Sequence, residues 1–253
     1  MSQPLPPDAD PFFSFSINPQ PTATSCGPTC LHAVYHFFGL DLTVASLMRA
    51  VPTVAGGGTI AVWLGVDALR RGFRARLYTC NLRVLDPTWF PPEPGKPPDR
   101  ALLRAKIAAA TKARRRPKER GELKALAEFL DLGGDLRMEP LSPSLLRRFL
   151  RAGLPIIAGL SCTFLYGDPR VLPETGADDD LRGEPEGHFV VVTQDPSGDR
   201  KAVTVHDPSP ESPFDDPHCY DVGMDRLINA ILLGVLTFDA NILVLSPAAA
   251  PIP

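Results

Sequence analysis

Two valine-rich segments near the C-terminal end constrain the fold more than any other feature of the 253-residue chain. Residues 189–193 (FVVVT) and 202–206 (AVTVH) are rich in β-branched side chains, which favour strands. Between them, Pro196 to Asp199 (PSGD) has the residue types of a turn. We therefore expect an antiparallel hairpin. If it is symmetric about the middle of this turn, Val190 pairs with Val205.

The same register brings two ionisable side chains together at the open end of the hairpin. His188 and Asp207 would lie directly opposite each other, and opposed residues share one face of a sheet. An imidazole beside a carboxylate can hydrogen-bond to it, which fixes the tautomer and supports the imidazolium form. This prediction depends on the register, because a slip of one residue would move one of the two side chains to the other face.

Helical patterns fill the first part of the chain, and most strand patterns follow them. The expected helices are 26–38, 43–50, a helix opening at Thr59, 99–116, 122–130, 143–152 and 224–233; the expected strands are 73–79, 154–160, the two hairpin strands and 241–245. Helices first and strands mostly afterwards predict an α+β fold rather than a repeated βαβ unit.

Cys26 opens the first expected helix and is followed at once by Gly27 and Pro28. A thiol in the first helical turn lies beside unpaired backbone N–H groups and the positive end of the helix dipole, which favour the thiolate. Cys30 lies one turn deeper and lacks this advantage. The helix should bury one stripe, made of Cys26, Cys30, Ala33, Val34 and Phe37.

Together, Cys26, His188 and Asp207 supply the thiol, imidazole and carboxylate of an enzyme that transfers acyl groups through a cysteine nucleophile. Gln20 lies six residues before Cys26. Its side-chain amide could stand beside the Cys26 N–H and donate to an oxyanion.

These motifs resemble those of the papain-like cysteine peptidases, specifically the bacteriocin-processing (double-glycine leader) peptidase branch and its stand-alone relatives. In that family a glutamine lies about six residues before the cysteine of a Cys-Gly motif, as in 20–30 (QPTATSCGPTC). The family's histidine precedes an apolar strand, as in 187–192 (GHFVVV), and its aspartate precedes a proline, as in 206–208 (HDP). The resemblance covers residues 18–80 and 140–245.

The resemblance implies a papain-like α+β fold, with the nucleophile helix packed on an antiparallel sheet. It implies Cys26 as nucleophile, His188 as general base and acid, Asp207 as the residue that orients His188, and Gln20 as oxyanion donor. No metal or organic cofactor is implied. We therefore expect a peptidase or amidohydrolase that acts on a peptide or protein through a thioester.

Two alternatives stay open at this point. The same triad could deliver the acyl group to an amine, as in a transamidase or peptide ligase. The chain could also be a binding module that holds a peptide without cleaving it. The best-known members of the family are domains of peptide-exporting ABC transporters, whereas this sequence contains no apparent membrane span and no P-loop.

We expect a single domain over 18–246, with insertions near 81–121 and 166–187 and flexible termini at 1–17 and 247–253. The first insertion overlaps a basic stretch, 96–124, which holds eleven basic and three acidic residues. We interpret its most basic run, 112–120, as a solvated face. The acidic segment 174–186 precedes His188 directly and could serve as a lid or a selector of cationic substrates.

The bulk composition suggests where the protein works. The N-terminus lacks the pattern of a secretory signal, and five cysteines without a paired framework suit a reducing compartment, so we expect a cytoplasmic protein. A net charge of -3 gives no reason to expect nucleic-acid or membrane partners. The oligomeric state is left open.

We assign Cys30, Cys80, Cys162 and Cys219 to packing. We interpret His32 and His36 as ordinary histidines, although their spacing could hold a metal, because no glutamate of a zinc-protease motif accompanies them.

Overall fold

The computed structural model of the chain describes residues 15–54, 57–194, 201–237 and 240–253. Its helices are α1 (Cys26–Phe37), α2 (Val44–Ala50), α3 (Ala61–Arg70), α4 (Arg100–Ala113), α5 (Pro117–Asp131), α6 (Pro143–Arg151) and α7 (Met224–Leu233), with short helical turns η1 (Pro87–Trp89), η2 (Thr163–Gly167) and η3 (Gly234–Leu236). Its strands are β1 (Arg74–Thr79), β2 (Asp135–Arg137), β3 (Ile156–Ser161), β4 (Gly187–Gln194), β5 (Ala202–His206), β6 (Cys219–Gly223) and β7 (Asn241–Ser246). The expected α+β class is confirmed.

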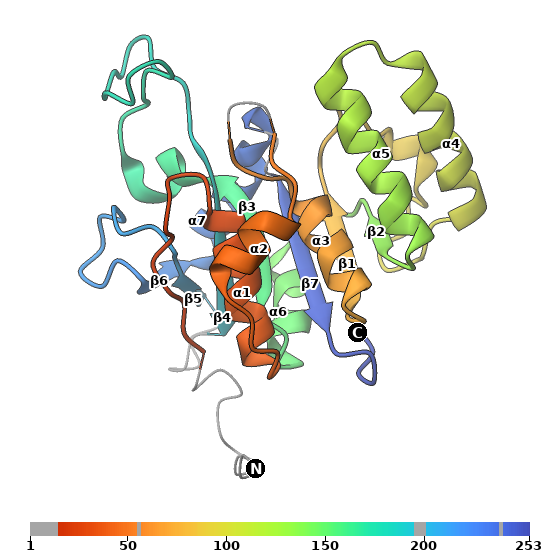
Figure 1. Ribbon diagram of the computed structural model, residues 1–253, viewed down its shortest axis with the longest axis horizontal. Coiled ribbons are helices and arrows are strands. Elements are labelled where there is room, and N and C mark those ends of the chain that lie inside the picture. The colour runs from red at the N-terminus through yellow and green to blue at the C-terminus, as the bar shows by residue number, and fades with distance from the viewer. Residues whose placement is uncertain (1–14, 55–56, 195–200, 238–239) are drawn as a thin grey trace.

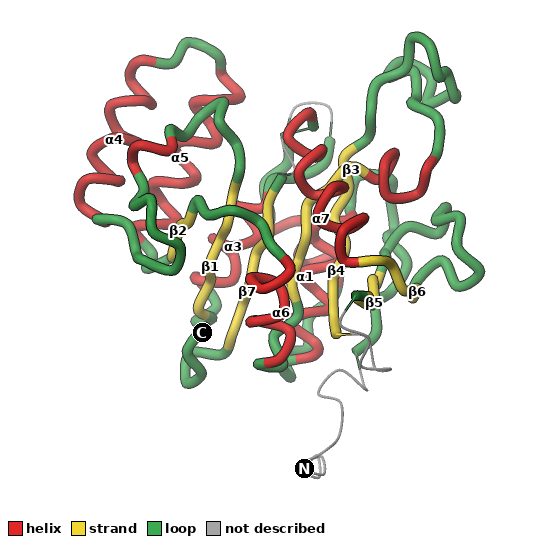
Figure 2. The backbone as a smooth tube through the Cα atoms, turned by 180° about the vertical axis from the view of Figure 1, so that it is seen from behind, coloured by secondary structure: helices red, strands yellow, loops and turns green. Residues whose placement is uncertain are grey.

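All the strands form one sheet in the order β2-β1-β7-β3-β4-β5-β6. The pairing is antiparallel throughout, except between β1 and β2. Helices α1 and α3 pack on one face of the sheet (Figure 1), and α6 and α7 cover the other (Figure 2). Because both faces are covered, β4 is buried from His188 to Thr193 instead of alternating with exposed positions.

Local sequence signals set where several helices begin. Thr43, Asp99 and Ser142 precede α2, α4 and α6, and each side chain accepts a hydrogen bond from a backbone N–H of the first turn. Proline follows at the start of α6 and also opens α5, where its missing N–H costs nothing. The described part of the chain contains no helix that is both long and apolar enough to cross a bilayer.

The β4–β5 hairpin is present, but its expected register is wrong by two residues. Val205 pairs with Val192 and not with Val190, and the ladder ends where His206 pairs with Val191. The expected turn at Pro196 to Asp199 lies outside the described residues. A shift of two preserves the side-chain face, because the strand period is two. His188 and Asp207 therefore still share a face, but they meet diagonally beyond the paired rungs.

Helix α1 is buried more widely than the expected single stripe. From Cys26 to Tyr35 only His32 is not buried, and Phe37 is only partly buried. The stripe prediction was too narrow because α1 packs against β4, α2 and α3 at once. Gly27 lies where a Cβ atom would come within 2.4 Å of the Thr59 side chain, so a glycine allows the start of α1 to approach this loop closely.

The two segments expected to be insertions lie at opposite ends of the sheet. Residues 81–121 include η1, α4 and the start of α5, and the α4–α5 hairpin stands beside β2 (Figure 1). Residues 166–187 project beyond the β4–β6 end (Figure 1). The division into one domain with two insertions stays a prediction.

Most of the expected N-terminal tail, 1–17, lies outside the described residues. The C-terminal residues 247–253 lie against β1, where Arg74 donates to the Ala248 carbonyl at 2.9 Å and Arg76 donates to the Ile252 carbonyl at 3.1 Å. The expected flexibility of this end stays a prediction.

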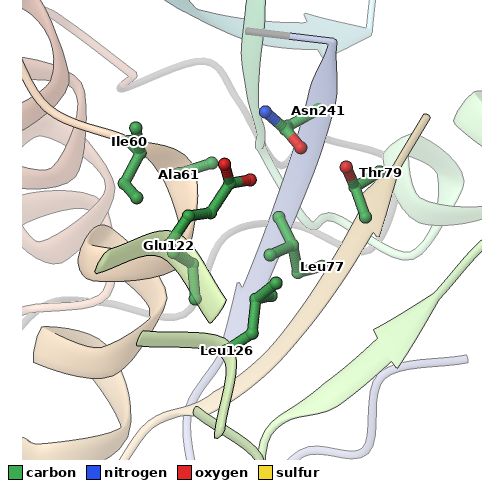
Figure 3. A pocket seen from close by; sticks show the side chains of 8 residues that line it. Ile60, Ala61, Leu77, Thr79, Glu122, Leu126 and Asn241 are labelled. Carbon is green, nitrogen blue, oxygen red and sulfur yellow. The ribbon is translucent and has the colours of Figure 1, made fainter. Parts of the chain in front are cut away.

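A small cavity lies between α5 and the sheet. Figure 3 shows Glu122 of α5 facing the ends of β1 and β7, where Thr79 and Asn241 lie. The cavity measures about 10 Å³, roughly the room that one water molecule needs. Burial raises the pKa of Glu122 to about 7, although the Asn81 amide donates to its carboxyl group at 2.8 Å. Glu122 therefore binds its proton more tightly in the fold than in the unfolded chain.

We predict that replacing Glu122 with glutamine makes the protein less sensitive to alkaline pH. The folded pKa is raised, so the wild-type fold loses stability as the pH rises from about 4.5 to about 7. At pH 8 the loss is about 3 kcal/mol, because one pKa unit corresponds to roughly 1.4 kcal/mol. Glu122→Gln keeps the acceptor for Asn81 without the charge. In thermal melts at pH 5 and pH 8, its midpoint should fall by several degrees less than that of wild type.

Glu128→Gln is the matched control, because Glu128 lies on the same helix but pairs with Arg70 at the surface. Its melts should change with pH as those of wild type do. An equal fall in melting midpoint from pH 5 to pH 8 in wild type and Glu122→Gln would contradict the prediction.

Candidate active site

Cys26 is the first residue of α1 and is 8% exposed. The preceding residue, Ser25, exchanges hydrogen bonds with Thr22, because its hydroxyl donates to the Thr22 carbonyl at 2.8 Å and accepts from the Thr22 N–H at 3.0 Å. This local turn sets the direction in which the chain enters the helix. N–H groups of a first turn have no helical acceptor, so the sulfur lies beside unsatisfied donors.

His188 and Asp207 form a buried hydrogen-bonded pair. His188 Nε2 lies 2.7 Å from Asp207 Oδ1, and the two side chains are 8% and 0% exposed. An ionised carboxylate can only accept, so Nε2 carries the proton and donates it. Nδ1 is then the ring nitrogen left to face Cys26, whose side chain lies close enough to raise the pKa of this imidazole.

Four donors surround the Asp207 carboxylate. Oδ1 accepts from His188 and from the Ser209 N–H at 2.8 Å. Oδ2 accepts from the hydroxyls of Tyr166, at 2.7 Å, and Tyr220, at 2.6 Å. A carboxylate offers about four lone-pair positions, and here each has a partner. The fully buried charge is thus satisfied.

The environment favours the charged form of both members of the pair. Burial opposes the imidazolium, but hydrogen bonds to Asp207 and Cys26, with their charges, raise the pKa of His188 to about 10. Burial alone would raise the pKa of Asp207, but His188, Tyr220 and Tyr166 together hold it below its ordinary value. At neutral pH, a protonated imidazole therefore lies between a carboxylate and a sulfur.

Gln20 comes to the same place through the backbone. Its N–H donates to the Pro208 carbonyl at 2.8 Å, which ties the segment before α1 to the residue after Asp207. The Gln20 side chain lines a cleft that also reaches His188. Its Oε1 atom is buried and has no hydrogen-bond partner within the part of the chain that the structure describes. The hydrogen-bonding capacity of this oxygen is therefore unmet.

A cleft of about 580 Å³ opens over this cluster. Gln20, Cys162, Tyr166 and His188 line its inner part. Its remaining ionisable lining residues are all acidic: Asp168, Asp178, Glu186 and Glu211. The segment expected to form a lid thus contributes two carboxylates, and the cleft presents negative charge to whatever enters it.

The other cysteines differ from Cys26 in their surroundings. Cys30 is fully buried, donates to the Phe189 carbonyl at 3.2 Å, and has a pKa raised well above its usual value by burial. Burial also raises the pKa of Cys80 and Cys162. Cys219 is exposed as a residue, but its sulfur is still partly desolvated by the surrounding protein. This desolvation, together with the charges of Asp216 and Asp221, raises its pKa. These thiols are protonated at neutral pH.

His32 and His36, considered above as possible metal ligands, each contact another partner. His32 Nε2 lies 2.9 Å from the Leu42 carbonyl, and His36 Nδ1 lies 3.0 Å from Asp41 Oδ1. Among the described residues, no three or more His, Cys, Asp and Glu side chains are grouped to hold a metal ion.

The structure adds two residues to the site that the sequence did not indicate, Tyr166 and Tyr220. Tyr166 lies in η2, a turn without a clear sequence pattern, and Tyr220 lies in β6, a strand that was not expected. The placement of Tyr220 and Val222 on either side of the polar Asp221 is the signal that could have revealed β6. Nothing in the local sequence links either phenol to Asp207.

Comparisons with known proteins give a likeness to solved structures but not to curated sequences. No protein-family model matches the chain, and no curated protein matches it. Among solved structures, it is similar to the peptidase domain of Streptococcus ComA, a bifunctional ABC transporter involved in a quorum-sensing pathway. The sequence identity is 14%, the match covers 92% of this chain and 98% of that domain, and the TM-score is 0.41.

Proposed function

We propose that the protein is a cysteine peptidase or amidohydrolase of the papain-like type, acting on a peptide substrate. The observation that carries the proposal is the buried line of three groups, in which Asp207 accepts from His188 at 2.7 Å and His188 faces Cys26 at the start of α1. This arrangement supplies an activated sulfur nucleophile and a proton donor. The cleft above supplies room for a peptide.

The geometry supports a two-stage reaction. The Cys26 thiolate attacks the carbonyl carbon, and the resulting oxyanion accepts hydrogen bonds from the Cys26 N–H and from the Gln20 amide, turned so that its NH₂ group enters the cleft. His188 gives a proton to the leaving amine as the C–N bond breaks, which leaves a thioester. His188 then takes a proton from water, which attacks the thioester, releases the acid and restores the thiolate.

The acceptor of the acyl group decides between hydrolysis and transfer. Water yields a free acid, whereas an amine yields a new amide of higher mass, as in a transamidase or peptide ligase. Mass spectrometry of the products, with and without added amines, distinguishes these outcomes. Profiling wild type with a peptide library, beside a Cys26→Ala control, would identify the substrate. We propose the cytoplasm as the protein's compartment, because its five free cysteines suit a reducing environment.

We predict that iodoacetamide at pH 6 modifies Cys26 before Cys219, although Cys26 is buried and Cys219 is exposed. Thiolate, not thiol, is the reactive form. The raised pKa of His188 keeps an imidazolium beside the Cys26 sulfur, whereas the raised pKa of Cys219 keeps that thiol protonated. Peptide mass spectrometry over a time course measures the two rates.

His188→Gln is the control for this labelling, because it removes the imidazolium and leaves both cysteines in place. The preference for Cys26 should disappear in this variant. Equal labelling of the two cysteines in wild type would favour the alternative of a non-catalytic peptide-binding module.

A further inference from the structure

Two of the four tyrosines in the chain donate to the same oxygen atom. Tyr166 and Tyr220 both contact Oδ2 of Asp207, at 2.7 and 2.6 Å. They must be the donors, since the carboxylate only accepts. Burial and the nearby Asp207 charge raise the pKa of both phenols above the usual value, so both stay protonated.

The two phenols reach Asp207 from different elements and share one support. Tyr220 belongs to β6 and pairs with Val205 of β5, two residues before Asp207. Its ring stacks on Phe214 with centroids 3.8 Å apart. Tyr166 belongs to η2 and meets the same Phe214 ring edge-on at 6.2 Å. Phe214 therefore supports both rings that hold the carboxylate.

These contacts fix the orientation of the Asp207 carboxylate. Rotation about its last bond would break both phenol contacts at Oδ2 and the contacts of His188 and Ser209 at Oδ1. Each is a hydrogen bond to a charged group, the stronger kind. Fixing Oδ1 fixes the direction of His188 Nε2–H, and with it the nitrogen that faces Cys26.

We propose that Tyr166 and Tyr220 are positioning residues that hold Asp207 ionised and correctly oriented for His188. The proposal rests on the proposed function of Cys26, His188 and Asp207. The two phenols differ in one respect. Tyr166 also lines the cleft, and Asp168, the first of the acidic residues that line it, lies two residues after Tyr166. It therefore forms the wall between the substrate and the buried carboxylate, whereas Tyr220 holds Asp207 from within the sheet.

The other groups that face Asp207 come from each element packed against it. They are His188 of β4, Cys30 of α1, Cys162 before η2, and His218, whose ring contacts the Asp207 carbonyl at 2.7 Å. The thiols of Cys30 and Cys162 are neutral because their pKa values are raised. Apart from His188, the two phenols are thus the side chains of the described residues that donate hydrogen bonds to this carboxylate.

The test compares Tyr166→Phe, Tyr220→Phe and the double variant with wild type. Each single change should lower kcat about tenfold with little change in KM, since it removes only the hydroxyl that bonds to Asp207 and leaves the aromatic ring in place. The acid limb of kcat/KM should move to higher pH, because Asp207 loses donors that lower its pKa. Tyr35→Phe is the matched control, since Tyr35 donates to a different carboxylate, Asp67, at 2.7 Å.

A purely structural role predicts a different result. The Tyr166→Phe and Tyr220→Phe proteins would then melt at lower temperature, as is expected of Tyr35→Phe, but keep the wild-type kcat and acid limb, and that result would overturn the proposal. Should the double variant not fold, the single variants decide. The pH profile of Cys26 alkylation gives a readout without a substrate, with an acid limb at higher pH expected in both variants. Failure of wild type to hydrolyse any peptide would therefore count against the proposed function and not against this role.

Discussion

Replacing Cys26 with alanine should lower hydrolysis of the best peptide substrate by at least about 10⁴-fold, because no other group can form the thioester. The measurement is kcat/KM for purified wild type and variant. Alanine occupies less volume at a site that is only 8% exposed, so the fold should be retained. Full activity in Cys26→Ala would refute the proposed function.

Cys30→Ala is the matched control, one helical turn away on the same helix. Cys30 is more deeply buried than Cys26, and its sulfur donates to the Phe189 carbonyl. Its loss should lower the melting temperature, with a cost of about 1 kcal/mol for the lost contact and the small cavity. Activity at a temperature where the protein remains folded should stay near that of wild type. The two variants thus separate the chemical role of a thiol from its packing role.

Replacing His188 with glutamine should lower kcat/KM by about 10³-fold, since general acid–base catalysis and the imidazolium partner of the thiolate are both lost. Glutamine can still donate one hydrogen bond to Asp207, so the buried carboxylate keeps a partner. The decrease should appear in kcat, because His188 acts on the proton of the leaving group. Steady-state kinetics with one peptide at several concentrations measures this division.

His206→Gln is the control on the same hairpin. His206 is also a buried histidine with a hydrogen-bond partner, because its Nε2 lies 2.9 Å from the Thr193 hydroxyl. It faces the other side of the sheet, and burial lowers its pKa to about 4, so it is neutral. This variant should lose stability and keep its rate. Equal kinetic losses in the two variants would mean that His188 has no special role.

The elements with strong local patterns could be predicted from the sequence. The helix that begins at Cys26 and the two strands of the hairpin carry periodic or β-branched sequences with turn residues beside them, and each forms near its expected bounds. The three-residue β2 and the polar β6 were missed, because short strands at or near the edge of a sheet carry little hydrophobic signal. Their pairing is decided by neighbours that are distant in the sequence.

The candidate site also combines features that the local sequence predicts with features that depend on tertiary contacts. The face that His188 shares with Asp207 follows from the strand period alone, so it survived a register that was wrong by two residues. The distance between their side chains does not follow from the period, because it depends on how the chain leaves the ladder after His206. The convergence of Tyr166 and Tyr220 on one oxygen is a tertiary contact between separate elements, which no local pattern encodes.

Cys26 and the pair formed by His188 and Asp207 are synthesised at very different times. The hydrogen bond from Cys30 to Phe189 joins residues 159 positions apart. Synthesis proceeds from the N-terminus, so Cys26 leaves the ribosome long before His188 and Asp207 exist. A nascent chain therefore carries a thiol with neither base nor carboxylate. If the proposed function holds, reactivity should arise only after β7 has joined β1 to β3 and completed the sheet, so the growing polypeptide would not attack itself or its neighbours during translation.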